Sequence, residues 1–310
     1  MRAALRQLLS MLSLSALLAS CGGGGSSGSA AAPLPPAPPA PPATPGLVTT
    51  GCGNYQGVSQ GTTYAFLGIR YAAAPTGSRR WQAPQTLPCP TAVQQASAFG
   101  SKCPQLDLES MAFVGDEDCL TLNIWAPAAS VGSTSARRPV LFFIHGGGNS
   151  LGASSELLAG GVATYRGDRL AAVANAIVVT VNYRIGPLGF LAHPTLDAEG
   201  AQGTSGNYGT LDQIAGLRWV RDWISSFGGD PSRVMIFGQS AGGQNTCMLV
   251  ASPLAAGLFS AATILSGGCP GRTRAQIDTA TQSLATKAGC TAGNSPLACL
   301  RGKKIGRAHV

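Results

Sequence analysis

Charged side chains are scarce in this sequence: Asp, Glu, Lys and Arg make up 11% of its 310 residues, while 45% are apolar. The apolar residues nevertheless form no run long enough to span a bilayer as a helix. Six of the 21 basic side chains lie in the first six and last ten positions, and the other 15 nearly balance 13 acidic ones. Because the formal charge of +8 comes largely from the two ends, it does not indicate a nucleic-acid partner. Length and composition predict one large globular domain or a part of one.

The first 20 residues have the features of a targeting segment. Arg2 and Arg6 precede a short apolar run, and the whole of residues 1–20 fits a signal peptide. The run ends in LASC (18–21), which resembles the lipobox of bacterial lipoproteins, whose cysteine carries a diacylglyceryl group. We expect lipidation at Cys21, although an ordinary secretory signal cleaved near a cysteine is the alternative.

Residues 21–46 continue from this cysteine as a linker rich in Gly, Ser and Pro, which cannot bury enough apolar surface to fold. This composition favours a flexible tether between a lipid anchor and a globular domain. We therefore expect a lipid-anchored protein outside the cytoplasm, at the outer membrane or cell surface. Eight further cysteines would then lie where disulfides persist.

Continuous β-branched and aromatic runs follow the linker, at 139–148, 176–184, 233–238 and 261–267. Such runs are typical of strands buried on both faces of a parallel sheet. Between the second and third runs, residues 207–229 carry apolar side chains at helical spacing. The alternation predicts an α/β fold with a mostly parallel central sheet and flanking helices.

Six blocks of the sequence, in order, resemble the N-terminal half of type-B carboxylesterases. This α/β-hydrolase family includes the bacterial para-nitrobenzyl esterases and the cholinesterases. The blocks are 66–84, 117–127, 142–148, 179–193, 206–243 and 258–268. The resemblance assigns residues 47–303 to a carboxylesterase domain that is truncated before the last strands of the sheet.

The pattern Gly-Gln-Ser-Ala-Gly at 238–242 indicates a serine nucleophile, Ser240, displayed on a sharp strand-to-helix turn. Neighbours at such a turn must be small, as the two glycines are. The resemblance implies an oxyanion hole made by backbone N–H groups of Gly147, Gly148 and Ala241. It also implies that His145 shapes this glycine loop and does not carry protons.

Two positions depart from the family pattern beside these residues. Gln239 stands where many relatives carry glutamate, which argues against a preference for cationic choline esters. Asn149 follows the glycines where an aromatic residue is frequent, so we expect a differently shaped acyl pocket.

The resemblance also implies structural pairs. These are the ion pairs Arg80–Glu117 and Arg184–Asp212, and the disulfides Cys103–Cys119 and Cys290–Cys299. Solvated surface charges are the alternative for the ion pairs. We expect Cys247, in the helix after the nucleophile, to be a buried thiol, and we leave the pairing of Cys52, Cys89 and Cys269 open.

Histidine is rare, with three residues in all, and only His309 follows Ser240. The order Ser240, Asp278, His309 imitates an α/β-hydrolase triad, but Asp278 falls in a predicted helix and no strand-like run follows Cys290. We therefore expect the chain to stop before its catalytic acid and histidine. Residues 304–310 break the family pattern and match the translation of a common sequencing adapter, so we expect them to be a non-native tail.

The sequence thus predicts a serine carboxylesterase that forms an acyl-enzyme on a small-molecule carboxylic ester and needs no metal or organic cofactor. The chain by itself is expected to be an inactive or insoluble fragment. The alternative is a catalytically inactive cell-surface binding protein on the same fold. The acyl and alcohol groups of the substrate and the oligomeric state stay open.

Overall fold

The computed structural model describes residues 44–157, 163–200, 203–269, 271–291 and 296–304. Cys21, the linker up to residue 43 and His309 lie outside the described residues. Within the described ranges, no helix is both long enough and apolar enough to cross a membrane.

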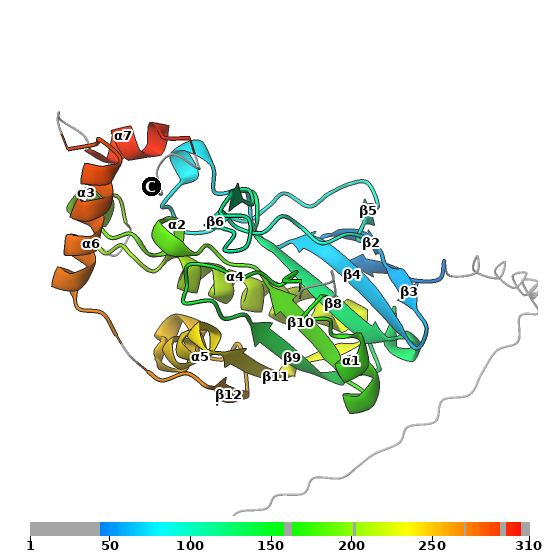
Figure 1. The fold of residues 1–310 in the computed structure, drawn as a ribbon. Helices are drawn as coiled ribbons and strands as arrows, with labels where there is room; N and C mark the ends of the chain where they lie inside the picture. Colours follow the sequence, from blue (N-terminus) through cyan, green and yellow to red (C-terminus); the bar gives the residue numbers. More distant parts are fainter. Residues whose placement is uncertain (1–43, 158–162, 201–202, 270, 292–295, 305–310) are drawn as a thin grey trace, which may run out of the picture. The chain divides into compact units, whose positions relative to one another are not determined.

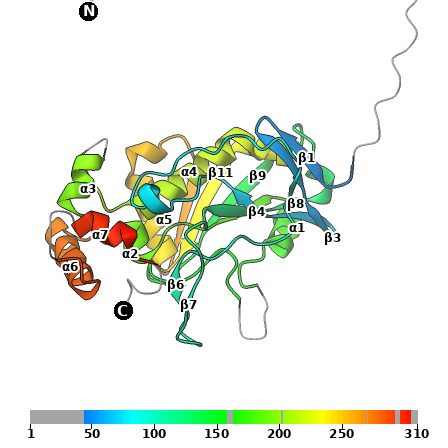
Figure 2. The ribbon, with the colours of Figure 1, turned by 90° about the horizontal axis from the view of Figure 1, so that it is seen from above.

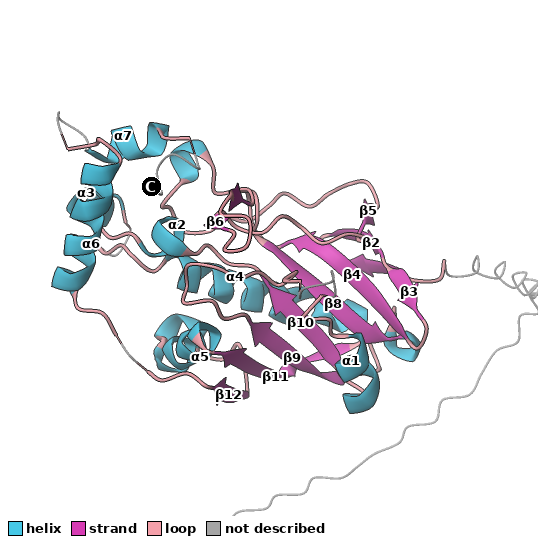
Figure 3. Cartoon of the chain, viewed as in Figure 1, coloured by secondary structure: helices cyan, strands magenta, loops and turns pink. Residues whose placement is uncertain are grey.

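A seven-stranded sheet forms the centre of the fold, in the order β12-β11-β9-β10-β8-β4-β3 (Figures 1 and 3). The four strands from β12 to β10 are parallel, and the pairings from β10 through β8 and β4 to β3 are antiparallel. The strands are β3 (Val58–Gln60), β4 (Thr63–Arg70), β8 (Thr121–Pro127), β9 (Arg138–Ile144), β10 (Ile177–Val181), β11 (Gly229–Gln239) and β12 (Ala261–Leu265).

The four predicted strands are those of the parallel half, and they form where the apolar runs occur. Every residue of β10 is buried, and Val179 pairs with Phe142 of β9, which in turn pairs with Ile236 of β11. The α/β prediction is confirmed. The antiparallel half contributes as many pairings as the parallel half, and the sequence analysis did not identify its strands.

Helices cover both faces of this sheet (Figure 2). One face packs on α1 (Asp168–Ala174), where Ala171 contacts Trp125 and Val178 in a small cluster. The other carries the main core, to which α4 (Tyr208–Trp223) contributes Leu217 and Val220, and α5 (Ala241–Ala251) contributes Leu249. The predicted helical spacing over 207–229 thus places the apolar side of α4 on the sheet.

A second apolar cluster lies to one side of the sheet, where four short elements gather (Figures 1 and 2). They are α2 (Gly186–Phe190), α3 (Pro194–Glu199), α6 (Arg274–Lys287) and α7 (Pro296–Gly302). The Thr281 hydroxyl on α6 donates to the Ala192 carbonyl at 2.8 Å, and Arg274 pairs with Asp197 of α3 at 2.7 Å. These contacts fix α6 beside the segment that follows β10.

Short strands, helical turns and disulfides hold the remaining segments. The small strands are β1 (Leu47–Thr50), β2 (Gly53–Gln56), β5 (Gln94–Gln95), β6 (Gln105–Leu106) and β7 (Phe113–Val114). The single-turn 3₁₀ helices are η1 (Gly77–Arg79), η2 (Ala128–Ser130), η3 (Ile224–Phe227) and η4 (Pro253–Ala255).

The disulfides Cys103–Cys119 and Cys290–Cys299 are present, which confirms both predicted pairs. Two further bonds join Cys52 to Cys89 and Cys247 to Cys269. The prediction that Cys247 is a buried free thiol was wrong. Cys247 is only half-buried on α5, on a side where the chain returns after β12 and brings the two Cα atoms within 5.6 Å.

Candidate active site

Ser240 lies at the sharp turn between β11 and α5. Its φ of 56° and ψ of −121° are a backbone conformation that residues other than glycine rarely adopt. A Cβ atom at Gly238 would overlap the Gly242 carbonyl, and one at Gly242 would overlap the Ile144 carbonyl. Both positions therefore require glycine, as the sequence predicts.

Backbone hydrogen bonds fix this turn from two sides. The Ser240 N–H donates to the Leu265 carbonyl of β12 at 2.8 Å, and the Ser240 carbonyl accepts from Gln244 N–H at 3.0 Å. Ser240 is thus the N-cap residue of α5 and is half-buried. Because the first N–H groups of a helix have no partner within it, the turn presents free amides around the hydroxyl.

The predicted oxyanion loop passes directly against Ser240. A Cβ atom at Gly146 would lie 3.2 Å from the Ser240 Cβ atom, so the two backbones are in close contact. Gly147 and Gly148 have φ values of 105° and 64°, which glycine adopts without strain. Within the described part of the chain, the N–H groups of Gly147, Gly148 and Ala241 donate to no acceptor. Three amides of the loop and of the turn are therefore without a partner among the described residues.

His145 contacts this loop and holds it in place. Its ring is buried and stacks on Tyr183 with 4.4 Å between ring centroids, and its Nδ1 atom lies 2.9 Å from the Gly146 carbonyl oxygen. Burial lowers the pKa of His145 to about 4, because the charged form would lose its hydration. The Tyr183 hydroxyl donates to the His145 carbonyl at 2.8 Å. These contacts give His145 a role in shaping the loop.

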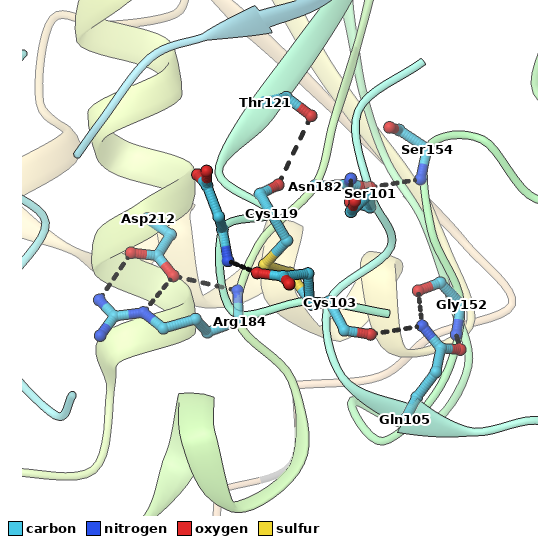
Figure 4. The surroundings of a disulfide bond; sticks show 12 residues. Ser101, Cys103, Gln105, Cys119, Thr121, Gly152, Ser154, Asn182, Arg184 and Asp212 are labelled. Carbon is cyan, nitrogen blue, oxygen red and sulfur yellow. Dashed lines mark hydrogen bonds and ion pairs between the residues drawn. A yellow bond between two sulfur atoms is a disulfide. The ribbon is translucent and has the colours of Figure 1, made fainter. Parts of the chain in front are cut away.

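The Cys103–Cys119 disulfide region holds the far end of the same loop (Figure 4). Gln105 receives a hydrogen bond from Gly152 N–H at 2.7 Å and donates to the Gly152 carbonyl at 3.0 Å. Asn182, just after β10, accepts from Ser154 N–H at 2.8 Å. The sequence analysis missed these residues. For Asn182 the available signal was a polar pair, Asn182 and Tyr183, directly after an entirely buried strand.

The sequence profile of the carboxylesterase family matches residues 44–307. The chain belongs to this family. It is 42% identical over 235 residues to the para-nitrobenzyl esterase of Bacillus subtilis, covering 74% of this chain and 45% of that protein. It is also 42% identical over 222 residues to the fumonisin B1 esterase of Sphingopyxis macrogoltabida, covering 71% of this chain and 39% of that protein.

Solved structures show the same family resemblance. A PNB esterase structure matches with a TM-score of 0.75 at 38% identity and covers 86% of this chain and 52% of its own. A thermophilic PNB esterase matches with the same TM-score at 37% identity, covering 86% of this chain and 53% of its own. The chain thus spans about half the length of these relatives.

Two ion pairs that the resemblance implies are present in the structure, one buried and one partly buried. Arg184 and Asp212 form a bidentate pair at 2.7 and 2.8 Å whose side chains are 3% and 0% exposed (Figure 4). Burial disfavours the charged guanidinium, but the attraction of Asp212 outweighs it and raises the pKa of Arg184. Arg80 pairs with Glu117 at 2.5 and 2.7 Å.

A cavity of about 720 Å³ lies between α2, α4, α5 and α6. Gly148 of the glycine loop and Gln244 of α5 are part of its wall, but Ser240 itself is not. The lining combines apolar side chains of α2, α5 and α6 with amides such as Asn245, and Arg272 is the one charged residue among its described members. Among the described lining residues there is no carboxylate.

The described residues contain no catalytic triad around Ser240. Asp278, which the sequence analysis had already rejected, pairs with Arg274 on α6 at 2.7 Å. His145 is held in the loop, and His193 caps α3 by accepting from Thr195 N–H at 3.1 Å. No group of acidic, cysteine or histidine side chains in the described ranges could hold a metal ion.

Proposed function

We propose that the protein is a serine carboxylesterase in which Ser240 is the nucleophile. One observation carries this proposal: a serine in a strained turn lies against a glycine loop with unpartnered N–H groups. The Ser240 Oγ atom attacks the ester carbonyl carbon, and the N–H groups of Gly147, Gly148 and Ala241 stabilise the oxyanion. Removing one such donor typically lowers turnover about 10²–10³-fold.

The reaction then runs through an acyl-enzyme. A general base accepts the Ser240 proton and returns it to the departing alcohol, and water hydrolyses the acyl group to a carboxylic acid. We propose that the general base is a histidine, and that this histidine and its partner acid lie in a longer protein of which this chain is part. In support, the ring nitrogens of His145 and His193 that have partners in the described residues bond Gly146 and Thr195, not Ser240, and the chain covers 45% of the para-nitrobenzyl esterase.

We also propose that cationic esters are poor substrates. The exposed Gln239 replaces a carboxylate beside the nucleophile, and no carboxylate lines the described cavity wall. The test compares hydrolysis of butyrylcholine with that of 3,3-dimethylbutyl butyrate, its uncharged isostere. We expect the neutral ester to have the higher kcat/KM, and a preference for butyrylcholine would contradict the proposal.

We propose that Cys21 anchors the protein by lipid outside the cytoplasm. The four disulfides among the described residues support an oxidising compartment. Metabolic labelling with radioactive palmitate tests this, and Cys21→Ser should remove both the label and membrane association. Labelling that persists in this variant would show that the anchor is elsewhere.

Reaction of the full-length protein with a fluorophosphonate probe tests the nucleophile. We expect a covalent adduct on the peptide that contains Ser240, and neither the adduct nor ester hydrolysis in Ser240→Ala. A folded full-length protein without an adduct would favour the alternative function, a binding protein on the esterase fold.

A further inference from the structure

Asn149 directly follows the glycines of the loop and has a left-handed backbone with a φ of 56°. Its side-chain amide faces Asn245 of α5, the helix that begins after Ser240. The Asn245 Nδ2 atom donates to Asn149 Oδ1 at 2.8 Å, and the Asn149 Nδ2 atom donates to Asn245 Oδ1 at 3.2 Å. Two amides therefore bind each other through a reciprocal pair of hydrogen bonds.

Tyr183 and Gly186 make further contacts with Asn149. The Tyr183 hydroxyl, which bonds the His145 carbonyl, also lies 3.3 Å from Asn149 Oδ1. The Asn149 carbonyl accepts from Gly186 N–H at 2.5 Å. Asn245 is 3% exposed and Asn149 is half-buried, so the pair of hydrogen bonds is partly shielded from competing water.

This geometry points to a role that sequence comparison does not assign. We propose that Asn149 and Asn245 are positioning residues that hold the N–H groups of Gly147 and Gly148 at a fixed distance from the Ser240 Oγ atom. Asn149 is adjacent to Gly148 in the chain, and Asn245 lies little more than one turn after Ser240 on the same helix. The amide pair thus ties the oxyanion donors to the element that carries the nucleophile.

The inference rests on the proposed esterase function and adds a kinetic signature to it. The side-chain amides bond each other and not Ser240, so the role that we propose for them is the placement of the glycine N–H groups. A misplacement of about 1 Å in an active site can cost about 10²-fold in rate. We therefore expect loss of the amide pair to lower kcat roughly 10–100-fold while KM changes little, because the donors bind the oxyanion more strongly than the ground-state carbonyl.

The experiment uses the full-length protein with para-nitrophenyl butyrate. Asn149→Gly removes the side chain and keeps a left-handed backbone accessible, and Asn245→Ala places the strongest helix former in α5. Both substitutions are therefore chosen to preserve the fold. Asn175→Gly is the matched control, because Asn175 is also left-handed, with a φ of 49°, but is exposed at the end of α1 on the opposite face of the sheet.

We expect each single variant and the double variant to show a similar loss of kcat, because the two residues act as one unit. A trifluoromethyl ketone, which imitates the tetrahedral intermediate, should lose affinity by the same factor. The carboxylic acid product should bind as before, and the control should match the wild type.

An active wild type whose variants keep kcat overturns the positioning role alone, and so does a loss that is fully additive in the double variant. A loss seen in KM without kcat also contradicts it. A wild-type protein that hydrolyses no ester overturns the proposed function and the positioning role with it.

Discussion

At the scale of single residues, the sharp turn at Ser240 and its two glycines was predictable because its steric requirement is local. Gly238 and Gly242 have no room for a Cβ atom, and this requirement is encoded within five consecutive positions. Asn245 and Gln105 were not predictable, because their partners are 96 and 47 residues away in the sequence. A single sequence does not show which distant amide a side chain will meet.

The burial of His145 predicts a pH dependence of stability. In the unfolded chain a histidine has a pKa of about 6.5, whereas the folded protein lowers the pKa of His145 to about 4. Between these values the unfolded state binds a proton that the folded state does not. The free energy of unfolding should therefore decrease as the pH falls from 6.5 to 4, by up to about 3 kcal/mol from this residue.

Urea unfolding of the full-length protein at several pH values measures this dependence. His145→Gln should be less stable overall but should show a flatter pH dependence between 4 and 6.5. An unchanged slope in this variant would mean that His145 is not the responsible group.

Because the Arg184–Asp212 pair is buried, breaking it should destabilise the protein more than breaking an exposed ion pair. Asp212→Asn leaves a buried guanidinium without its counterion, which typically costs about 3–5 kcal/mol. Asp222→Asn breaks the exposed pair with Arg221, whose side chains are 51% and 43% exposed, and should cost less than about 1 kcal/mol. Chemical denaturation compares the two variants, and equal losses would contradict the burial argument.

At the scale of elements, the sequence predicted the four strands that have continuous apolar runs. The expectation of burial on both faces was wrong for β12, whose residues are all exposed. The sequence did not identify β4 and β8, whose antiparallel pairing carries a register shift between Phe66 and Ile69. The wrong prediction of a free thiol at Cys247 also concerns the arrangement of elements. The course of the chain after β12 decides which cysteine it meets, and no local pattern encodes that course.

The Cys247–Cys269 bond predicts a measurable stabilisation. It closes a loop with a sequence separation of 22 and joins α5 to the segment after β12. Replacing both residues by alanine should lower the free energy of unfolding by about 2–4 kcal/mol. Thermal unfolding of oxidised wild type against the double variant measures this, and an equal Tm would show that the bond contributes nothing.

At the scale of the whole molecule, the chain covers about half of its relatives, and one edge of its sheet is exposed. All five residues of β12 are exposed, and Ile264 and Leu265 are 40% and 42% accessible. Among the described strands, β12 pairs only with β11. Exposed apolar edge strands promote association between chains.

Residues 44–304 produced alone should therefore associate through β12. Light scattering coupled to size-exclusion chromatography should show oligomers, and Ile264→Lys should shift the population toward monomer because a charge opposes edge pairing. A monomeric parent protein at micromolar concentration would contradict this expectation.

The most direct test of the central claim is mass spectrometry of the full-length protein quenched with acid during turnover of para-nitrophenyl acetate. We predict a mass increase equal to one acetyl group, located on the peptide that contains Ser240 and absent from Ser240→Ala. Hydrolysis that continues in Ser240→Ala, or an acetyl group that forms on another residue, would contradict the account.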